Sequence, residues 1–285
     1  MRIIKRIKGF QEYFYLQHSL RKGSKVITKE KYIGLEIPKD IEEIKRDFLK
    51  EVKLDLYSKL EFIKKNFQKE WRSVPESAKQ KQLEEISIAF TYNTNAIEGS
   101  KITLEEAREI IHDKIAPNKS LRDVNETEAH SKTFLQMLRD KNKMSDEILL
   151  KWHKEIFSST KEDIAGKYRE YLVRVGSYLA PDWQEVEKMM RELVGFINKN
   201  LDKLNSVELS AKAHYRFEKI HPFGDGNGRV GRLLMNYILW HTGYPMIIIE
   251  YKKRKSYYKA LTKDEEGFVS YFIKRYLSTH KNRLK

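Results

Sequence analysis

The twelve residues His221-Pro-Phe-Gly-Asp-Gly-Asn-Gly-Arg-Val-Gly-Arg232 join two stretches with the character of helices. Residues 209–220 carry apolar side chains at helical spacing, and residues 230–240 are largely apolar and contain no proline. We therefore expect a glycine-rich loop that enters a helix N-terminus. Such a loop points backbone N–H groups outward, and the helix dipole favours a negative charge there. The segment predicts a phosphate-binding loop.

The glycines and arginines of this segment suit a phosphate. Gly224, Gly226 and Gly228 allow positive φ and close backbone approach, as a phosphate nest requires. Arg229 and Arg232 are three residues apart, so they fall on one face of the new helix and can clamp phosphate oxygens.

Two titratable residues complete the segment. Asp225 offers a hard oxygen ligand suited to Mg²⁺ on a nucleotide. His221 has a reference pKa of about 6.5, which suits a general base near neutral pH. Together the residues indicate phosphoryl or nucleotidyl transfer. The competing interpretation, a glycine-rich turn whose histidine only packs in a core, leaves this combination unexplained.

The segment resembles the signature of the Fic/Doc (Fido) family, His-Pro-Phe-x-Asp-Gly-Asn-Gly-Arg-x-x-Arg, at every fixed position. The resemblance covers roughly residues 85–280. It implies a mainly α-helical fold with a Fic-type core and a β-hairpin flap. It also implies a protein adenylyltransferase, which moves AMP from ATP onto a Tyr, Thr or Ser hydroxyl of a target protein or of itself.

The same resemblance assigns roles within the signature. His221 would take the proton of the attacking hydroxyl, and Asp225 would hold Mg²⁺, or alternatively Mn²⁺, on the α- and β-phosphates. Arg232 would take the γ-phosphate. The implied nucleotide-binding residues of the segment are Asp225, Gly226, Asn227, Gly228, Arg229, Val230, Gly231 and Arg232.

A second short motif lies upstream, at the end of a helix predicted over 76–96. Glu98 precedes Gly99, so it lies at a helix C-terminus, where the dipole disfavours a carboxylate unless a cation is near. Thr94-x-x-x-Glu98-Gly99 resembles the inhibitory motif of the Fic class with an N-terminal inhibitory helix, here about 85–99. The resemblance implies that Glu98 pairs with Arg232 and blocks seating of the γ-phosphate. The alternative is an ordinary glutamate before a C-cap glycine.

Residues 166–181 predict a β-hairpin. This prediction rests on the alternation at Tyr171, Val173 and Val175, on the central Gly176-Ser177 and on a closing proline. The hairpin resembles the Fic flap, which would hold the target side chain by strand-like pairing near the base. Val173, Arg174, Val175 and Gly176 are therefore counted with the nucleotide site. A plain connecting hairpin is the alternative.

Two aromatic residues follow the signature helix. Tyr257 and Tyr258 lie in a segment that resembles the family's wall for the nucleotide base, where aromatic faces can line adenine. Many Fic proteins have an Asn a few residues on, whereas this chain has Asp264-Glu265-Glu266. The choice between AMP, UMP and another transferred group thus stays open, as does the reverse reaction, in which water removes AMP from a modified protein.

The N-terminal part lies outside the resemblance. Residues 1–37 have the aromatic and β-branched character of a small β unit, with a turn at 21–25. Residues 38–71 carry an apolar stripe at steps of three and four, which predicts a long helix, either a connector or half of a homodimer interface. We expect three parts: the β unit at 1–37, a helical linker at 38–84 and the catalytic core at 85–285.

Composition sets further limits. The 285 residues include no cysteine, which excludes disulfides and thiolate zinc sites. No apolar run is long enough to span a membrane, so we expect a cytoplasmic protein without a membrane partner. His130 and His153 fall inside predicted helices, where packing is expected rather than metal ligation.

The net charge of +15 raises the question of nucleic acid. Lysine dominates it, mostly beside acidic residues or at helical spacing, as on a solvated face. We therefore do not expect a nucleic-acid partner. The non-enzymatic alternative is a nucleotide-sensing regulator whose basic ends contact nucleic acid; the presence of His221 disfavours it, because a sensor has little need of a base.

Overall fold

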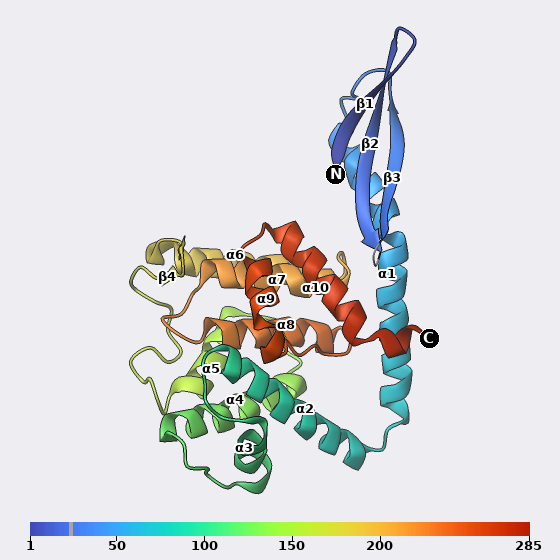
Figure 1. Ribbon diagram of the computed structural model, residues 1–285. Helices are drawn as coiled ribbons and strands as arrows, with labels where there is room; N and C mark the ends of the chain where they lie inside the picture. Colours follow the sequence, from blue (N-terminus) through green and yellow to red (C-terminus); the bar gives the residue numbers. More distant parts are fainter. Residues whose placement is uncertain (23–24) are drawn as a thin grey trace. The chain divides into compact units, whose positions relative to one another are not determined.

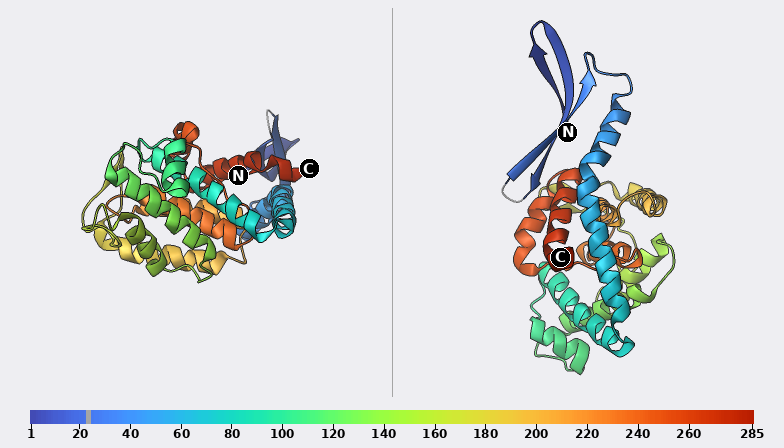
Figure 2. Two further views of the ribbon diagram at one scale, coloured as in Figure 1. Left: turned by 90° about the horizontal axis from the view of Figure 1, so that it is seen from below. Right: turned by 90° about the vertical axis from the view of Figure 1, so that its right-hand side faces the viewer.

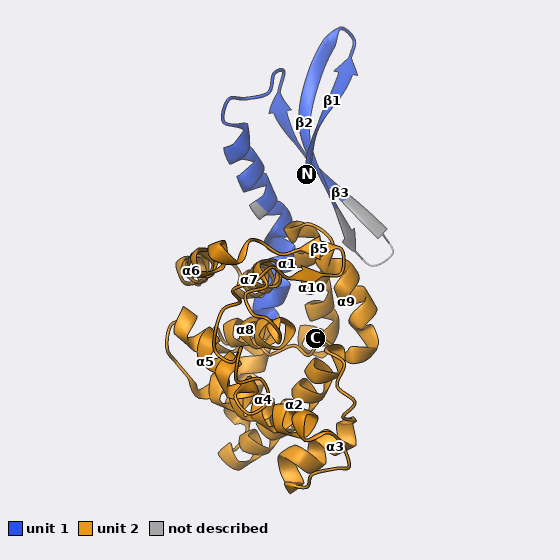
Figure 3. Cartoon of the chain, turned by 90° about the vertical axis from the view of Figure 1, so that its left-hand side faces the viewer, with its two compact units in different colours: residues 1–62 blue, residues 63–285 orange. Residues whose placement is uncertain are grey.

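The structure is a computed structural model that describes residues 1–22 and 25–285, with side chains described at all of these except 20–22, 25–27 and 50. The chain forms two compact units, residues 1–62 and 63–285 (Figure 3). The division falls inside the long helix α1 (Ile41–Ser73). The three functional parts expected from the sequence stay a prediction.

The first unit contains a three-stranded antiparallel sheet. Its strands are β1 (Arg2–Lys8), β2 (Gln11–Lys22) and β3 (Lys25–Gly34), in the order β1-β2-β3, so the predicted small β unit is confirmed. The turn predicted at 21–25 includes residues 23 and 24, which lie outside the described residues. A sheet of three strands needs an apolar face that is packed against something to be stable. Its buried Leu16 and Ile33 form a core with Phe48 and Val52 of α1.

The second unit is helical (Figure 1). Helix α8 is at its centre, packed against α2, α4, α5 and α7, and every residue from 227 to 239 is buried. Figures 1 and 2 show α7 and α8 side by side. The all-round burial of α8 explains why its sequence is apolar rather than striped. The unit's helices are α2 (Glu76–Ile97), α3 (Leu104–Arg108), α4 (Leu121–Arg139), α5 (Asp146–Phe157), α6 (Trp183–Asn200), α7 (Ser206–Ile220), α8 (Asn227–His241), α9 (Arg254–Leu261) and α10 (Glu265–Thr279), with short turns η1 (Glu109–Asp113), η2 (Tyr251–Lys253) and η3 (Lys281–Leu284).

The hairpin at 166–181 is present, but its strands are much shorter than the alternating sequence predicted. Within 166–181 only β4 (Arg174–Val175) and β5 (Tyr178–Leu179) pair, around Gly176 at φ +60°. Tyr171 and Val173 lie outside the strands. The rest of the segment is irregular, and its carbonyls at Tyr171 and Pro181 accept from a buried arginine, as described below.

The mainly α-helical fold is confirmed. No helix among the residues described, 1–22 and 25–285, is both long and apolar enough to cross a membrane.

Candidate functional site

The signature loop is tightly braced between α7 and α8. Helix α7 ends at Ile220, and the next residue, His221, has the left-handed conformation (φ +51°) and donates its N–H to Phe217 O at 2.9 Å. The Asn227 side chain accepts from Phe223 N (2.9 Å) and donates to Phe223 O (2.8 Å). The Phe223 ring is buried and stacks on His153 with 3.9 Å between centroids. The amide of Asn227 is thus used within the loop, and its backbone N–H remains for a ligand.

The three glycines act differently from expectation. Only Gly226, the residue before α8, has positive φ (+79°). Gly224 and Gly228 are needed for space instead: a Cβ at Gly224 would lie 2.1 Å from the Tyr171 hydroxyl, and one at Gly228 2.2 Å from Glu98 Oε1. Of the two properties that these glycines allow, Gly226 thus uses positive φ, whereas Gly224 and Gly228 use close approach; Gly228 is helical because α8 begins at Asn227.

A buried arginine that the sequence did not single out links the segment 166–181 to the turn that carries His221. Arg169, 3% exposed, donates to His221 O (2.8 Å), Tyr171 O (2.7 Å) and Pro181 O (2.7 Å). These bonds fix both ends of the flap segment to the turn that carries His221. Burial lowers the pKa of His221 below its ordinary value, and the Arg169 guanidinium contributes to this. His221 is therefore a neutral proton acceptor at neutral pH.

Asp225 has both carboxylate oxygens engaged. Oδ1 accepts from Gly226 N at 2.5 Å, and Oδ2 accepts from Lys161 Nζ at 2.6 Å. Burial acts to raise the pKa of Asp225, but Lys161 and Arg229 outweigh it and leave the pKa below its ordinary value. The side chain is 44% exposed. An ionised, accessible carboxylate fits a magnesium ion that takes its other ligands from phosphates and water.

The residues described, with 23 and 24 outside them, contain no group of three or more His, Cys, Asp or Glu that could hold a metal.

Arg229 and Arg232 have different acidic partners. Arg229 forms an ion pair with Glu126 of α4 and lies over the Phe157 ring. Arg232, 1% exposed, donates from Nη2 to Glu98 Oε1 (2.6 Å) and to Thr94 O (3.3 Å). Burial acts to lower the pKa of Arg232, but Glu98 outweighs it and raises the pKa. The contact between Glu98 and Arg232 that the resemblance implied is thus present.

Glu126 is a second residue that the sequence analysis missed. It accepts from Thr160 Oγ1 at 2.9 Å, and Lys161 Nζ and Arg122 Nε each lie 3.1 Å away. Burial acts to raise its pKa, but Arg229 and Lys161 outweigh it and lower the pKa to about 2. Its nearest buried neighbours on α4 are Thr127, His130 and Ser131, so no apolar stripe in the sequence singles out Glu126.

The end of α2 is held on two sides. Gly99 has φ +97° and ends the helix directly after Glu98, while Tyr258 Oη donates to Ile97 O at 3.1 Å. Thr94 is buried and presents its carbonyl to Arg232. Residues 94–99 are therefore packed against α8.

The two tyrosines expected at the base wall differ in exposure. Tyr257 is 1% exposed, with its hydroxyl 2.7 Å from His214 Nε2, whereas Tyr258 is 44% exposed. Of the acidic run that follows, Asp264 caps α10, and Glu265 pairs with Lys212 and Arg216. Tyr258 is thus the accessible aromatic face of the pair.

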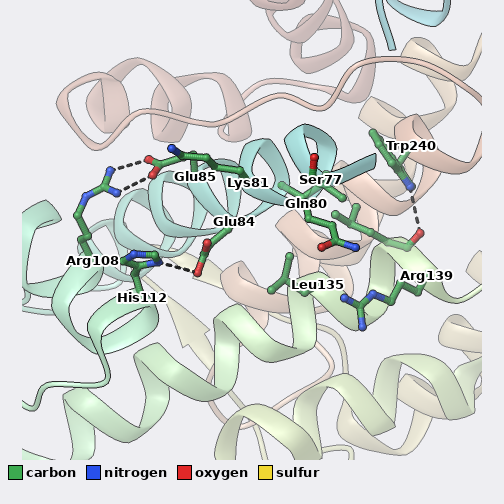
Figure 4. Close-up of a pocket in the computed structure, with 12 residues that line it drawn as sticks. Ser77, Gln80, Lys81, Glu84, Glu85, Arg108, His112, Leu135, Arg139 and Trp240 are labelled. Atoms are coloured by element: carbon green, nitrogen blue, oxygen red, sulfur yellow. Dashed lines mark hydrogen bonds and ion pairs between the residues drawn. The ribbon is translucent and has the colours of Figure 1, made fainter. Parts of the chain in front are cut away.

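A groove of about 840 Å³ lies along the first part of α2, away from the signature loop (Figure 4). Its walls come from α2, α3, η1 and α4, with Trp240 at one end. Figure 4 shows Arg108 reaching Glu85 and His112 reaching Glu84. These pairs fasten α3 and η1 to the helix that carries Glu98.

The sequence of this chain is similar to those of known proteins. Residues 143–239 match the Fic/DOC family model. "Protein adenylyltransferase Fic" of Nematostella vectensis is 32% identical over 201 residues, which cover 68% of this chain and 47% of that protein. "Protein adenylyltransferase fic-1" of Caenorhabditis elegans is 29% identical over 211 residues, covering 72% and 41%. Residues 143–239 thus form a Fic/DOC domain, and the matched part of the chain spans about half the length of these curated relatives.

Solved structures agree on the fold. A Fic-domain-containing signalling protein from Bacteroides thetaiotaomicron superposes with a TM-score of 0.69 at 25% identity, covering 81% of this chain and 94% of that one. Fic-1 (residues 134–508) from C. elegans gives a TM-score of 0.71 at 24% identity, covering 85% and 75%. The Fic fold predicted from the signature is confirmed.

Proposed function

We propose that this chain is a protein adenylyltransferase that transfers AMP from ATP to a Tyr, Thr or Ser hydroxyl and that Glu98 holds it inactive. One observation carries the proposal: the loop between α7 and α8 brings a neutral histidine and an ionised aspartate together at the start of the buried helix α8. The curated relatives, named protein adenylyltransferases, support the choice of reaction.

The geometry supports an in-line displacement at the α-phosphorus. The target hydroxyl oxygen forms a bond to this phosphorus while the bond to the bridging oxygen of pyrophosphate breaks. His221 accepts the hydroxyl proton, so the nucleophile is activated as it attacks. Backbone N–H groups at the start of α8 hold the phosphates. Asp225 would bind Mg²⁺, which when present neutralises charge on the phosphates. Positioning and charge stabilisation therefore do most of the catalytic work.

Inhibition follows from the position of Glu98. Its carboxylate lies against Gly228 and is hydrogen-bonded to Arg232, the residue proposed to take the γ-phosphate. A terminal phosphate and the Glu98 carboxylate carry like charges and require the same guanidinium. ATP therefore cannot take the productive position while Glu98 remains there.

The direct test is intact-mass spectrometry of the purified Glu98→Gly variant after incubation with ATP and Mg²⁺. We expect addition of AMP, and label that enters from α-labelled but not from γ-labelled ATP. Label from the γ-position alone would instead identify a phosphoryl transferase, and label from UTP in preference to ATP would identify UMP transfer. Failure to incorporate any of these labels into the protein or a lysate would refute the proposal.

The depressed pKa of His221 predicts the pH dependence of transfer. A base is active when unprotonated, so a pKa lowered by burial moves the acid limb of the rate profile to lower pH. We expect kcat/KM to be constant from pH 8 down to about 6.5, the ordinary histidine pKa, and to fall only below it. Nucleotide binding measured over the same range provides the control. An acid limb centred above pH 7 would contradict the assignment.

A further inference from the structure

Lys161 touches the metal-ligating residue of the proposed site, although it lies 64 residues away in the sequence. Its Nζ is 2.6 Å from Asp225 Oδ2 and 3.1 Å from Glu126 Oε1. The side chain is 12% exposed, and its ammonium lies over the Phe157 ring, 4.5 Å from the centroid. Lys161 is therefore a partly buried cation shared between two carboxylates.

The two oxygens of Asp225 are not equivalent. Oδ1 is fixed by the backbone N–H of Gly226 and has Arg229 at 3.7 Å. Oδ2 has Lys161 as its near partner, with Arg122 at 3.8 Å. A metal on this carboxylate would bind through Oδ2, the oxygen that no backbone group holds. The ammonium of Lys161 lies at this oxygen.

The segment that presents Lys161 is well fixed. Its backbone N–H donates to Phe157 O at 2.8 Å, so it continues from the end of α5. Gly166, a few residues on, donates to His153 Nδ1 at 2.9 Å, and His153 Nε2 in turn bonds to Asp225 O at 3.0 Å. The loop that carries Lys161 and the loop that carries Asp225 are thus joined through one histidine.

We propose that Lys161 is a resident counter-cation of Asp225 that the incoming metal–nucleotide must displace, so that this lysine sets the metal concentration at which the site fills. The inference rests on the proposed function. Displacement needs little movement, because Glu126 Oε1 is already 3.1 Å from Nζ and can retain the ammonium alone. Lys161 is a positioning residue and takes no part in the bonds made or broken.

The direction of the effect follows from charge. A positive group a few ångströms from a divalent cation opposes its binding, and it also occupies the oxygen that the metal uses. Removal of Lys161 leaves Asp225 in place, since the Gly226 N–H still holds Oδ1, and it leaves Glu126 with Arg229 and Arg122 as partners. Loss of the lysine should therefore strengthen metal binding rather than weaken it.

The test measures metal binding without turnover. Mg²⁺ is titrated by calorimetry into the Glu98→Gly protein saturated with α,β-methylene-ATP, and Mn²⁺ binding is followed by electron paramagnetic resonance. We expect Lys161→Met and Lys161→Gln to lower the half-saturating metal concentration about tenfold, as expected when one nearby charge is lost. Lys161→Arg keeps the charge and should stay near the parent. The exposed Lys167→Met in the same segment is the matched control.

The outcomes separate this inference from the proposed function. Metal-dependent nucleotide binding in the parent, with an equal or higher metal requirement in both neutral variants, would refute the role of Lys161 and leave the transferase proposal intact. Absence of metal-dependent nucleotide binding from every variant would refute both. In an Asp225→Asn background the effect of Lys161→Met should disappear; if it persists, Lys161 acts at another site. Thermal unfolding confirms that each variant is folded.

Discussion

Replacement of Glu98 by glycine should increase the rate of AMP transfer by about ten- to a hundredfold. Glu98 Oε1 is 2.6 Å from Nη2 of a nearly fully buried arginine. A hydrogen bond between charged groups contributes about 1.5–3 kcal/mol, which corresponds to roughly one to two orders of magnitude in the population of sites open to the γ-phosphate. The measurement is the initial rate of incorporation from α-labelled ATP.

Two further variants show whether this effect belongs to the carboxylate. Ser100→Gly adds a glycine just beyond the helix end without touching Arg232 and should leave the rate unchanged. Glu98→Gln keeps the size of the side chain but removes its charge, so its rate should fall between wild type and Glu98→Gly. A rate in Glu98→Gly equal to or below wild type would exclude an inhibitory role.

Replacement of His221 by alanine in the Glu98→Gly protein should lower the transfer rate by about 10²- to 10⁴-fold, the usual contribution of a general base. Nucleotide binding should persist, because the phosphates are proposed to contact the start of α8 and Arg232 rather than the imidazole. The rate and the nucleotide affinity are measured on the same preparation.

The backbone at His221 requires its own control. Its φ of +51° costs any residue with a Cβ about 1–2 kcal/mol. Histidine adopts positive φ more readily than most residues, so His221→Ala should also lower the melting temperature. Asparagine tolerates this conformation, and His221→Asn should be better folded but equally inactive. Undiminished labelling in a folded His221→Asn protein would remove the histidine from the mechanism.

The local part of this site could be predicted from the sequence. Gly226 and the flanking apolar stretches define a loop between two helices, and the structure has α7 ending at Ile220 and α8 beginning at Asn227. Such features depend on neighbouring residues, which the sequence displays directly. The family and its fold followed from the same segment.

The contacts across the chain could not be predicted. Arg229 meets Glu126 across 103 residues, and Asp225 meets Lys161 across 64. No local pattern identifies which of many lysines and glutamates become partners in a buried cluster. The glycines illustrate the same limit, since Gly228 is required by a side chain from α2 rather than by its own backbone angle.

The segment 166–181 shows that an alternating pattern can predict a hairpin correctly and still overestimate the length of its strands. Alternation from Tyr171 to Val175 favours a longer hairpin, yet the carbonyls of Tyr171 and Pro181 accept from the guanidinium of Arg169. Arg169 thus holds both ends of the segment, while strand pairing is confined to 174–175 and 178–179, and nothing in the alternation revealed this arginine.

The absence of a side chain at Gly228 has a consequence for how this protein can change by mutation. The same space admits the Glu98 carboxylate and, under the proposed function, a phosphate, and a Cβ there would lie 2.2 Å from Glu98 Oε1 and 2.9 Å from Arg232 Nη1. A substitution at residue 228 that displaces the Glu98 carboxylate would therefore also keep the phosphate from binding there. Under the proposed function, unregulated modification of target proteins can therefore arise through loss of the Glu98 carboxylate but not through a substitution of Gly228.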